Sequence, residues 1–579
     1  MRPLLAFLAA AHLAFAAEPD FPVTADSKAQ PEVPKGTMIK DTYTAKEGSV
    51  FPGTQREYQI YLPAGHDKTK PAAFMVFQDG VIYQAPVVFD NLIAKKDIPP
   101  LIGLFIKPGV VPAANDNALP RFNRSYEYDS ITPTYSQFLI DEFLPAIEAK
   151  HGLKLSTDPN QAAISGNSSG GICAFMVAWH RPDRFRRVFT GVGTYVGIHG
   201  ADQLPVLVRK FEPKPLRVFL QSGTGDNHLY CGDWWMANQM MERSLTWAGY
   251  DVNHAWGEGG HNQKHASQIF PDVLRWLWRD WQTNIEVKAN PKNESKWKGY
   301  DVVGNGEWKA VPIVNRKGSV QKLASNSHGD VVCVDWYPTG ERALLVKLPL
   351  EGDQSVFASM ESIYLLHDVV FGKKDCVYVL VSNRSSNDQV VRIDPNGMKT
   401  ILKAGEMNDA LLEHFGSVVN LARTGGIATP SPSESPWNSW SKGAFAMSPD
   451  QSSVYHIDSA VNSNVNVVQI RADGSFAHEQ SFHQLQPDWH GIIMGNGMCV
   501  DTNGWLYVAT SLGIQVCDQA GRVNFIIPTP NQPYDVCFGG KDLSELFIAC
   551  GDTIYKRPTK ARGVVSGQQA PIKPAPPKL

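Results

Sequence analysis

Residues 166–170 read GNSSG and fit the pattern G-x-S-x-G. In this pattern a serine sits on a sharp turn between a strand and a helix, and the flanking glycines let the backbones approach closely. An apolar run precedes the turn and an apolar helix start follows it. We therefore predict Ser168 as a nucleophile. A polar turn before a buried helix is the alternative interpretation of the motif taken alone.

Two later turns supply an acid and a base for such a nucleophile. The apolar run Arg217–Gln221 leads into SGTGD, which ends on Asp226, and Asp251–Trp256 leads into GEGGHN, which holds His261. Both turns follow strand-like runs, where α/β sheets expose functional residues. The order Ser, Asp, His predicts that His261 takes the Ser168 proton and that Asp226 orients His261.

Neighbouring residues offer alternatives to the acid and the base. Asp233 resembles a helix N-cap, and Glu258 a loop charge. His254 lies within a strand-like run, His265 opens the last helix, and His228 could line the pocket. We keep Asp226 and His261 because strand, turn and functional residue coincide there.

The oxyanion of an acyl transfer needs backbone N–H donors. One predicted donor is Ser169, directly after the nucleophile. The second is expected near Asp79-Gly80-Val81, in the turn after the apolar run Ala72–Phe77, with Gly80 as the candidate. Three aromatic residues after the acid could form a wall over the substrate or pack under the next helix: Tyr230, Trp234 and Trp235.

Strand and helix patterns alternate over residues 45–284, which predicts an α/β-hydrolase domain with a doubly wound, mostly parallel sheet. Residues 18–48 read as an irregular lead-in. The expected strands are Gln55–Leu62, Ala72–Phe77, Pro100–Ile106, Arg217–Gln221 and Asp251–Trp256, and the expected helices are Ser136–His151, Asp233–Ala248 and Gln268–Trp281.

The alternation of strand and helix patterns stops after Trp281. Residues 285–308 are polar and read as a linker, and residues 309–565 repeat a strand, a turn with Asp or Gly and a second strand. Repeats of roughly blade length predict a six-bladed β-propeller. The Pro-rich tail, residues 566–579, is expected to be disordered.

Residues 1–17 combine a positive start, a short apolar run and an A-x-A site, which predicts a signal peptide and export to the periplasm or medium. No other stretch is apolar and long enough for a membrane helix. The net charge of −3 over 579 residues, without a Lys/Arg block, argues against a nucleic-acid partner.

The eight cysteines form no C-x-x-C pair and no regular metal spacing, which argues against a zinc site. Most lie in apolar strand-like runs, so buried thiols and disulfides are equally compatible with the sequence.

The first domain resembles the esterase-D/enterochelin-esterase group of α/β-hydrolases, which includes feruloyl and other carbohydrate esterases. The matching pieces are FMVFQDG, the RSYEYD…FLIDEFLPAIE segment, SGNSSGG, SGTGD and GEGGHN. The resemblance implies hydrolysis of a carboxylic ester through an acyl-enzyme, without metal or other cofactor. The resemblance also implies that Ser168, Asp226 and His261, which stand at the matching motif positions, are the catalytic triad.

The second domain resembles the gluconolactonase/senescence-marker type of six-bladed propeller, through GNGMCVDTNGWLYVATS and DVCFGGKDLSELFIACG. That family holds a divalent metal with a Glu, an Asn and an Asp. Here Asn496 stands at the Asp position and Lys442 at the Asn position, and no first-blade Glu is evident. We therefore predict no metal in the propeller.

The leading hypothesis is an exported serine esterase acting on a small acylated substrate, plausibly a feruloyl or acetyl ester of carbohydrate. Alternatives are lactone hydrolysis by the propeller, hydrolysis of a siderophore ester by the first domain, and a propeller that binds a glycan.

Overall fold

The computed structural model describes residues 20–286, 295–313, 318–337, 342–363, 365–382, 388–401, 444–457, 464–471, 476–566 and 568–577. The chain forms two compact units. The first holds Met1–Val206 and Lys214–Lys288, and the second holds Leu207–Pro213 and Ala289–Leu579. The signal peptide predicted over residues 1–17 lies outside the described residues.

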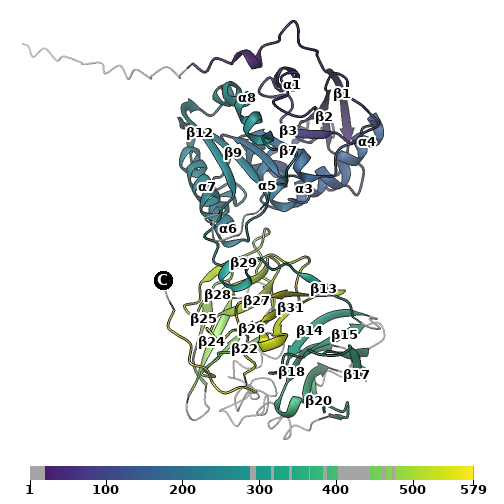
Figure 1. Cartoon of the computed structure of the whole chain (residues 1–579), viewed down its shortest axis with the longest axis vertical. Helices are drawn as coiled ribbons and strands as arrows, with labels where there is room; N and C mark the ends of the chain where they lie inside the picture. The colour runs from purple at the N-terminus through teal and green to yellow at the C-terminus, as the bar shows by residue number, and fades with distance from the viewer. Residues whose placement is uncertain are drawn as a thin grey trace, which may run out of the picture. The chain divides into compact units, whose positions relative to one another are not determined.

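A ten-stranded sheet forms the centre of the first unit (Figure 1). Strands β12, β9, β8, β7, β3 and β4 are parallel, and β2, β1, β5 and β6 extend the sheet antiparallel beyond β4. The sheet is therefore mixed rather than mostly parallel, because the short link between β1 and β2 allows only antiparallel pairing. The strands are β1 (Thr37–Thr44), β2 (Gln55–Leu62), β3 (Ala73–Gln78), β4 (Leu101–Ile106), β5 (Val110–Val111), β6 (Arg121–Phe122), β7 (Ala162–Asn167), β8 (Arg187–Gly191), β9 (Arg217–Gly225) and β12 (Asp251–Gly260).

Helices cover both faces of this sheet. In Figure 1 α3, α5 and α7 lie on one side, and α1 and α8 on the other. The helix predicted over residues 136–151 is present and runs without a break through α3 and α4, with a π-helical segment at Phe138–Phe143 between them. The lead-in contains β1, so it is not irregular throughout. The helices are α1 (Ala85–Ala94), α2 (Arg124–Tyr128), α3 (Thr134–Gln137), α4 (Leu144–His151), α5 (Ser169–His180), α6 (Leu204–Lys210), α7 (Trp234–Ala248) and α8 (Lys264–Trp278).

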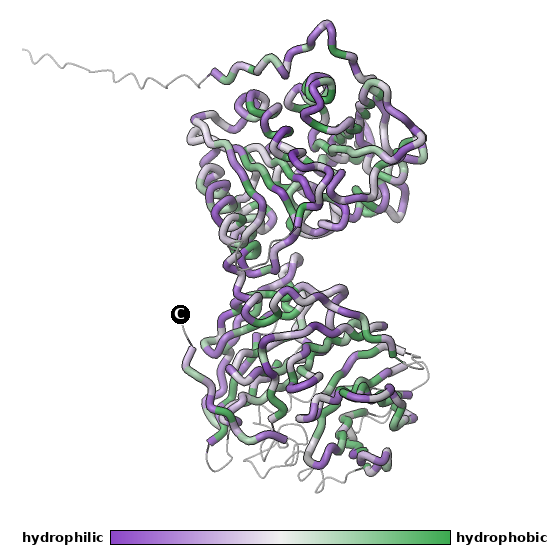
Figure 2. Tube along the Cα trace, viewed as in Figure 1, coloured by the Kyte–Doolittle hydropathy of each residue, from purple (hydrophilic) through white to green (hydrophobic). Residues whose placement is uncertain are grey.

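The central strands are apolar along their whole length because both of their faces are covered. All six residues of β3 and of β4 are buried, and Figure 2 shows hydrophobic colour along the middle of the sheet. A cluster of buried side chains from α1, α8 and the sheet, including Phe89, Phe270 and Trp278, fixes the face that α1 and α8 cover. This core holds the carboxyl ends of the parallel strands in place.

The second unit contains five four-stranded antiparallel sheets, each a propeller blade. The predicted six blades are thus corrected to five in the described part of the chain, and residues 402–443, between β21 and β22, lie outside it. The strands are β14 (Ser319–Ser325), β15 (Val331–Tyr337), β16 (Arg342–Leu348), β17 (Ser355–Glu361), β18 (Leu365–Phe371), β19 (Val377–Ser382), β20 (Asp388–Ile393), β21 (Lys399–Ile401), β22 (Phe445–Met447), β23 (Ser453–His456), β24 (Val465–Ile470), β25 (Phe476–His483), β26 (Gly495–Val500), β27 (Leu506–Thr510), β28 (Gly513–Cys517), β29 (Val523–Ile527), β30 (Asp535–Gly539), β31 (Glu545–Cys550), β32 (Thr553–Pro558) and β13 (Lys309–Val311).

The predicted linker is partly folded, and the predicted disordered tail makes single contacts while its described residues stay mostly exposed. Residues 295–308, predicted as part of a linker, include the helix α9 (Tyr300–Val303), and Trp297 is buried in the propeller core. In the tail, the Ile572 N–H donates to the Pro449 carbonyl at 2.8 Å. Both segments lack apolar periodicity. Their contacts are made by single side chains and single backbone hydrogen bonds, which a sequence pattern does not reveal.

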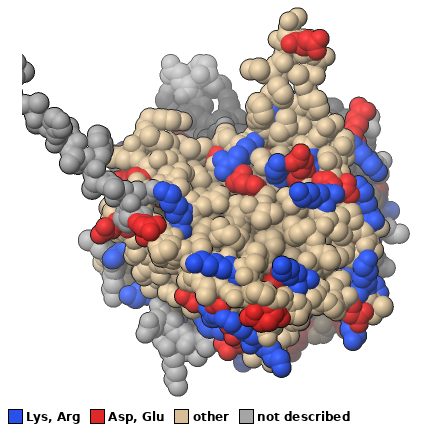
Figure 3. Space-filling view, turned by 90° about the horizontal axis from the view of Figure 1, so that it is seen from above, with Lys and Arg blue, Asp and Glu red and all other residues tan. Residues whose placement is uncertain are grey.

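All eight cysteines are free thiols. In the described residues no helix combines the length and hydropathy that crossing a membrane requires. On the face of the first unit that Figure 3 shows, basic and acidic side chains are interspersed around an uncharged centre. The absence of a nucleic-acid partner stays a prediction from composition.

The close approach of α5 to β7 predicts a specific sensitivity at Gly166. A Cβ at Gly166 would lie 2.2 Å from the backbone of Gly170. We expect Gly166→Ala to destabilise the first unit by about 2 kcal/mol or more, since neither backbone can yield cheaply. Thermal unfolding of the first unit measures this.

Gly152→Ala is the matched control. Gly152 caps α4 with a φ of 64° and a Cβ there meets nothing within 4 Å, so only the backbone cost of about 1 kcal/mol applies. Equal unfolding temperatures for the two variants would contradict the packing argument.

Candidate active site

Ser168 lies between β7 and α5 with a φ of 59° and a ψ of −123°. A residue with a side chain rarely adopts a positive φ, so the surrounding structure must hold it there. The Ser168 N–H donates to the Gly191 carbonyl at 2.8 Å, and the Ser168 carbonyl accepts from the Gly171 N–H at 2.9 Å. The turn presents the Ser168 side chain at the carboxyl edge of the sheet.

Ser168, His261 and Asp226 form one line of hydrogen bonds. The Ser168 Oγ lies 2.7 Å from His261 Nε2, and His261 Nδ1 lies 2.6 Å from Asp226 Oδ1. The Asp226 carboxylate is fully buried and also accepts from the Ser222 hydroxyl at 2.6 Å and the Asn227 N–H at 2.8 Å. Because an ionised carboxylate only accepts, His261 carries its proton on Nδ1 and offers Nε2 to the serine.

The acids and bases weighed as alternatives lie elsewhere. Asp233 caps α7 by accepting from the Met236 N–H at 3.0 Å, and Glu258 is exposed. His254 stacks on Trp256. His265 lies 3.2 Å from the Gln221 amide, and burial lowers its pKa. His228 is exposed in the two-stranded hairpin of β10 (His228–Leu229) and β11 (Gly232–Asp233).

The backbone N–H groups of the two predicted oxyanion donors differ in whether they already have a hydrogen-bond acceptor. Ser169 is the first residue of α5, where backbone N–H groups have no partner within the helix. The Gly80 N–H instead donates to the Ile106 carbonyl at 3.1 Å. This corrects the prediction for Gly80, because the positive φ of Asp79 and Gly80 turns that amide back toward β4.

Arg124 beside this turn was not predicted. Its guanidinium donates to both carboxylate oxygens of Asp79, at 2.7 and 2.9 Å, and to the Ser169 hydroxyl at 3.0 Å. Pairing with Asp79 raises the pKa of Arg124. The pair ties α2 and the turn after β3 to the start of α5, beside the nucleophile.

The three aromatic residues weighed as a substrate wall or as packing, Tyr230, Trp234 and Trp235, lie in different surroundings. Trp234 is 4% exposed, and its ring edge packs on His261 with 5.6 Å between ring centroids. Trp235 packs edge-on against Trp256. Tyr230, at the tip of the β10–β11 hairpin, is 97% exposed. Trp234 therefore supports the base, and Tyr230 is available to a ligand.

Sequence reasoning also missed Thr194, in the loop after β8. Its Oγ1 lies 3.3 Å from Ser168 Oγ and accepts from the Trp234 indole N–H at 3.2 Å. No motif marks this threonine, and only the position of β8 beside β7 could have indicated it.

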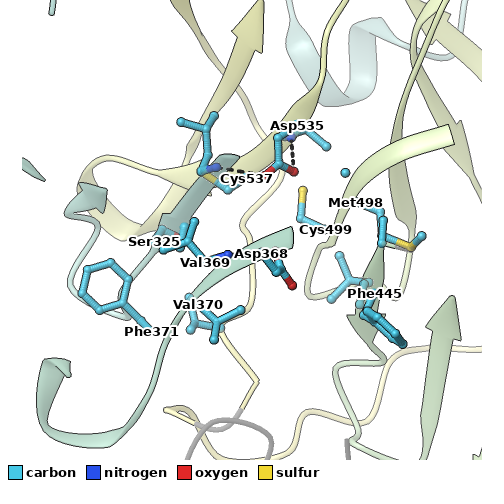
Figure 4. Close-up of a pocket in the computed structure, with 18 of the residues that line it drawn as sticks. Ser325, Asp368, Val369, Val370, Phe371, Phe445, Met498, Cys499, Asp535 and Cys537 are labelled. Carbon is cyan, nitrogen blue, oxygen red and sulfur yellow. Dashed lines mark hydrogen bonds between the residues drawn. The ribbon is translucent and has the colours of Figure 1, made fainter. Parts of the chain in front are cut away.

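A separate pocket lies among the inner strands β14, β18, β22, β26 and β30 of the propeller (Figure 4). Figure 4 shows the carboxylates of Asp368 and Asp535 near the Cys499 and Cys537 thiols. Asp535 accepts from the Leu323 N–H at 2.9 Å and the Val536 N–H at 2.8 Å. Burial nevertheless raises the pKa of Asp535 to about 6.

Each of the two units matches a known protein family model. Residues 49–292 match the family model described as Putative esterase. The first unit is therefore similar to esterases of this family. Residues 346–551 match the family model described as SMP-30/Gluconolactonase/LRE-like region, so the second unit is similar to that family.

The matches to individual proteins are partial. The iron(III) enterobactin esterase of Dickeya dadantii is 30% identical over 152 residues, covering 24% of this chain and 33% of that protein. Regucalcin of Sus scrofa is 31% identical over 105 residues, covering 17% of this chain and 34% of that protein. The chain thus spans about a third of the length of these two curated relatives.

Solved structures similar to the esterase domain include a ferulic acid esterase from Anaeromyces mucronatus, 18% identical, covering 44% of this chain and 94% of that chain, with a TM-score of 0.32. The enterobactin esterase from Shigella flexneri is 19% identical, covering 44% of this chain and 62% of that chain, with a TM-score of 0.34.

The propeller residues do not fit the divalent metal that the gluconolactonase resemblance implies. Asn496, at the position of the family's Asp, donates its amide to the Pro533 carbonyl at 3.3 Å. Both carboxylate oxygens of Asp535 already accept backbone N–H groups. Within the described ranges no three His, Cys, Asp or Glu side chains cluster for a metal, and Lys442 lies outside those ranges.

The raised pKa of Asp535 predicts a pH effect on the propeller. Between about pH 4 and 6 the folded state keeps a proton that the unfolded chain has lost, so the free energy of unfolding falls as pH rises through this window. Asp535→Asn should flatten the change in the propeller's unfolding temperature between pH 4.5 and pH 6.5. An equally steep change in the variant would contradict this origin. The exposed Asp552, replaced by Asn, serves as control.

Proposed function

We propose that the protein is an exported carboxylic-ester hydrolase whose esterase domain works through an acyl-enzyme on Ser168. The observation that carries the proposal is the unbroken line from the Ser168 hydroxyl through His261 to the buried Asp226, with bonds of 2.7 and 2.6 Å. The match of residues 49–292 to the esterase family model supports the reaction class. Export is proposed from the pattern of residues 1–17 alone.

The geometry supports a two-step mechanism. The Ser168 oxygen attacks the ester carbonyl carbon while His261 Nε2 takes the hydroxyl proton, and the Ser169 N–H faces the oxyanion. His261 then gives that proton to the leaving alcohol, and Ser168 is left acylated. Water then attacks the carbonyl carbon of the acyl-enzyme while His261 Nε2 takes a proton from it. His261 returns that proton to Ser168 Oγ as the carboxylic acid leaves. Asp226 stabilises the imidazolium in both steps.

The proposed substrates are small acyl esters of carbohydrate, with feruloyl or acetyl groups. The similarity to a ferulic acid esterase and the exposed ring of Tyr230, which can stack on an aryl group or a sugar, suggest this choice. The similarity to enterobactin esterases supports a siderophore ester as the second candidate within the same reaction class.

Lactone hydrolysis in the propeller is the alternative from another class, suggested by the match over residues 346–551. Its inner pocket is lined by the carboxylates of Asp368 and the buried Asp535, but the residues present do not fit a metal-dependent reaction. Glycan binding by the propeller stays a prediction, because no described contact tests it.

A panel of aryl and acyl esters, assayed on the wild type and two variants, tests the proposal. We expect Ser168→Ala to lower kcat at least a thousand-fold, and Asp226→Asn to lower it by a comparable factor because His261 then loses its tautomer. Both proteins should unfold near the wild-type temperature.

Asp233→Asn is the matched control, since asparagine caps a helix as well as aspartate does. Its activity should equal that of the wild type. Ester turnover that persists in Ser168→Ala would refute the proposal, and chelator-sensitive lactone turnover in that variant would favour the propeller instead.

A further inference from the structure

Thr194 lies where the topology brings the loop after β8 against the nucleophile. Strand β8 pairs with β7 on one side and with β9 on the other, so its loop lies between Ser168, which follows β7, and Asp226, which follows β9. The Thr194 side chain is 1% exposed, and its Oγ1 is 3.3 Å from Ser168 Oγ.

The backbone of this loop is held in a strained form. Val192 has a φ of 39°, which a β-branched residue rarely adopts. The Val192 N–H donates to the Gln221 carbonyl at 2.7 Å, and the Thr194 N–H donates to the Ser168 carbonyl at 3.2 Å. Strain of this kind persists where the surrounding structure over-determines a conformation, and it clusters at functional sites.

The donors and acceptors fix the direction of the hydrogen bond between the two hydroxyls. The indole N–H of Trp234 can only donate, so Thr194 Oγ1 accepts there and keeps its own proton for another acceptor. The Ser168 proton is committed to His261 Nε2. The Thr194 hydroxyl therefore donates to Ser168 Oγ, and all the bonds from Trp234 to Asp226 run in one direction.

We propose that Thr194 is a positioning residue for the nucleophile, oriented in turn by Trp234. Its hydroxyl donates to a lone pair of Ser168 Oγ and holds that oxygen in the rotamer that faces His261. This inference rests on the proposed function, because it concerns the oxygen that attacks the ester. Trp234 also packs its ring edge on His261, so one side chain supports both the base and the nucleophile's partner.

Two substitutions of Thr194 distinguish positioning from packing. Thr194→Ser keeps the hydroxyl and loses a methyl group, whereas Thr194→Val keeps the shape and loses the hydroxyl. We expect Thr194→Val to lower kcat about ten-fold with KM unchanged, the size of one lost hydrogen bond, and Thr194→Ser to stay within about two-fold of the wild type. Trp234→Phe should give an intermediate loss.

The rate at which a fluorophosphonate labels Ser168 is a second readout that does not depend on substrate binding, and it should follow the same order. Thr246→Val is the matched control, because the Thr246 hydroxyl bonds Glu242 on the exposed side of α7. A purely structural Thr194 would make Val the milder change and Ser the more damaging one.

Thr194→Val at the wild-type rate, or Ser more impaired than Val, would overturn the inference. If Ser168→Ala is inactive while Thr194→Val is fully active, only the role of Thr194 fails. If Ser168→Ala itself retains turnover, the proposed function fails, and with it the basis for this role.

Discussion

The site depends on one backbone conformation, the positive φ of Ser168 between β7 and α5. Only there does the chain turn sharply enough to present the hydroxyl while the next residues start a helix. The turn is possible because Gly166 lets the backbone of β7 lie against the backbone of Gly170 in α5 without a side chain between them. The buried sheet beneath supplies the rigidity that keeps the strained turn in place.

From this turn the polar groups follow in a consistent order. Three parallel strands end at the same edge and deliver Ser168, Asp226 and His261 to within hydrogen-bonding distance of one another. The buried Asp226 carboxylate is stabilised by the Ser222 hydroxyl and a backbone N–H rather than by a cation. These bonds hold the carboxylate where its Oδ1 accepts from His261 Nδ1.

The sequence was sufficient to predict those site residues that a local sequence pattern marks. Each of Ser168, Asp226 and His261 lies in a turn after a strand-like run, and that pattern is readable without knowing the fold. Thr194 and Arg124 could not be found in this way, because their roles arise from strand order and loop paths. Gly80 was wrong as a donor for a similar reason: its amide is turned to Ile106 by the backbone angles of its own loop.

In the propeller, too, features with a local sequence pattern were predicted and features that depend on tertiary contacts were not. Its repeated strands were recognised from the sequence, but the number of blades in the described chain is five rather than six. The described part of the predicted linker is folded, because Trp297 supplies one large buried side chain inside a polar segment. A single aromatic residue carries no periodicity, although it buries enough area to fix a segment.

The most direct test of the account is mass spectrometry of the full-length protein quenched during turnover of an activated aryl ester. The account predicts a covalent acyl group, one per chain, on the peptide that contains Ser168, with no acyl group when His261 is replaced by Ala. Turnover of the ester with no acylated peptide, or with the acyl group on a residue outside the esterase domain, would contradict it.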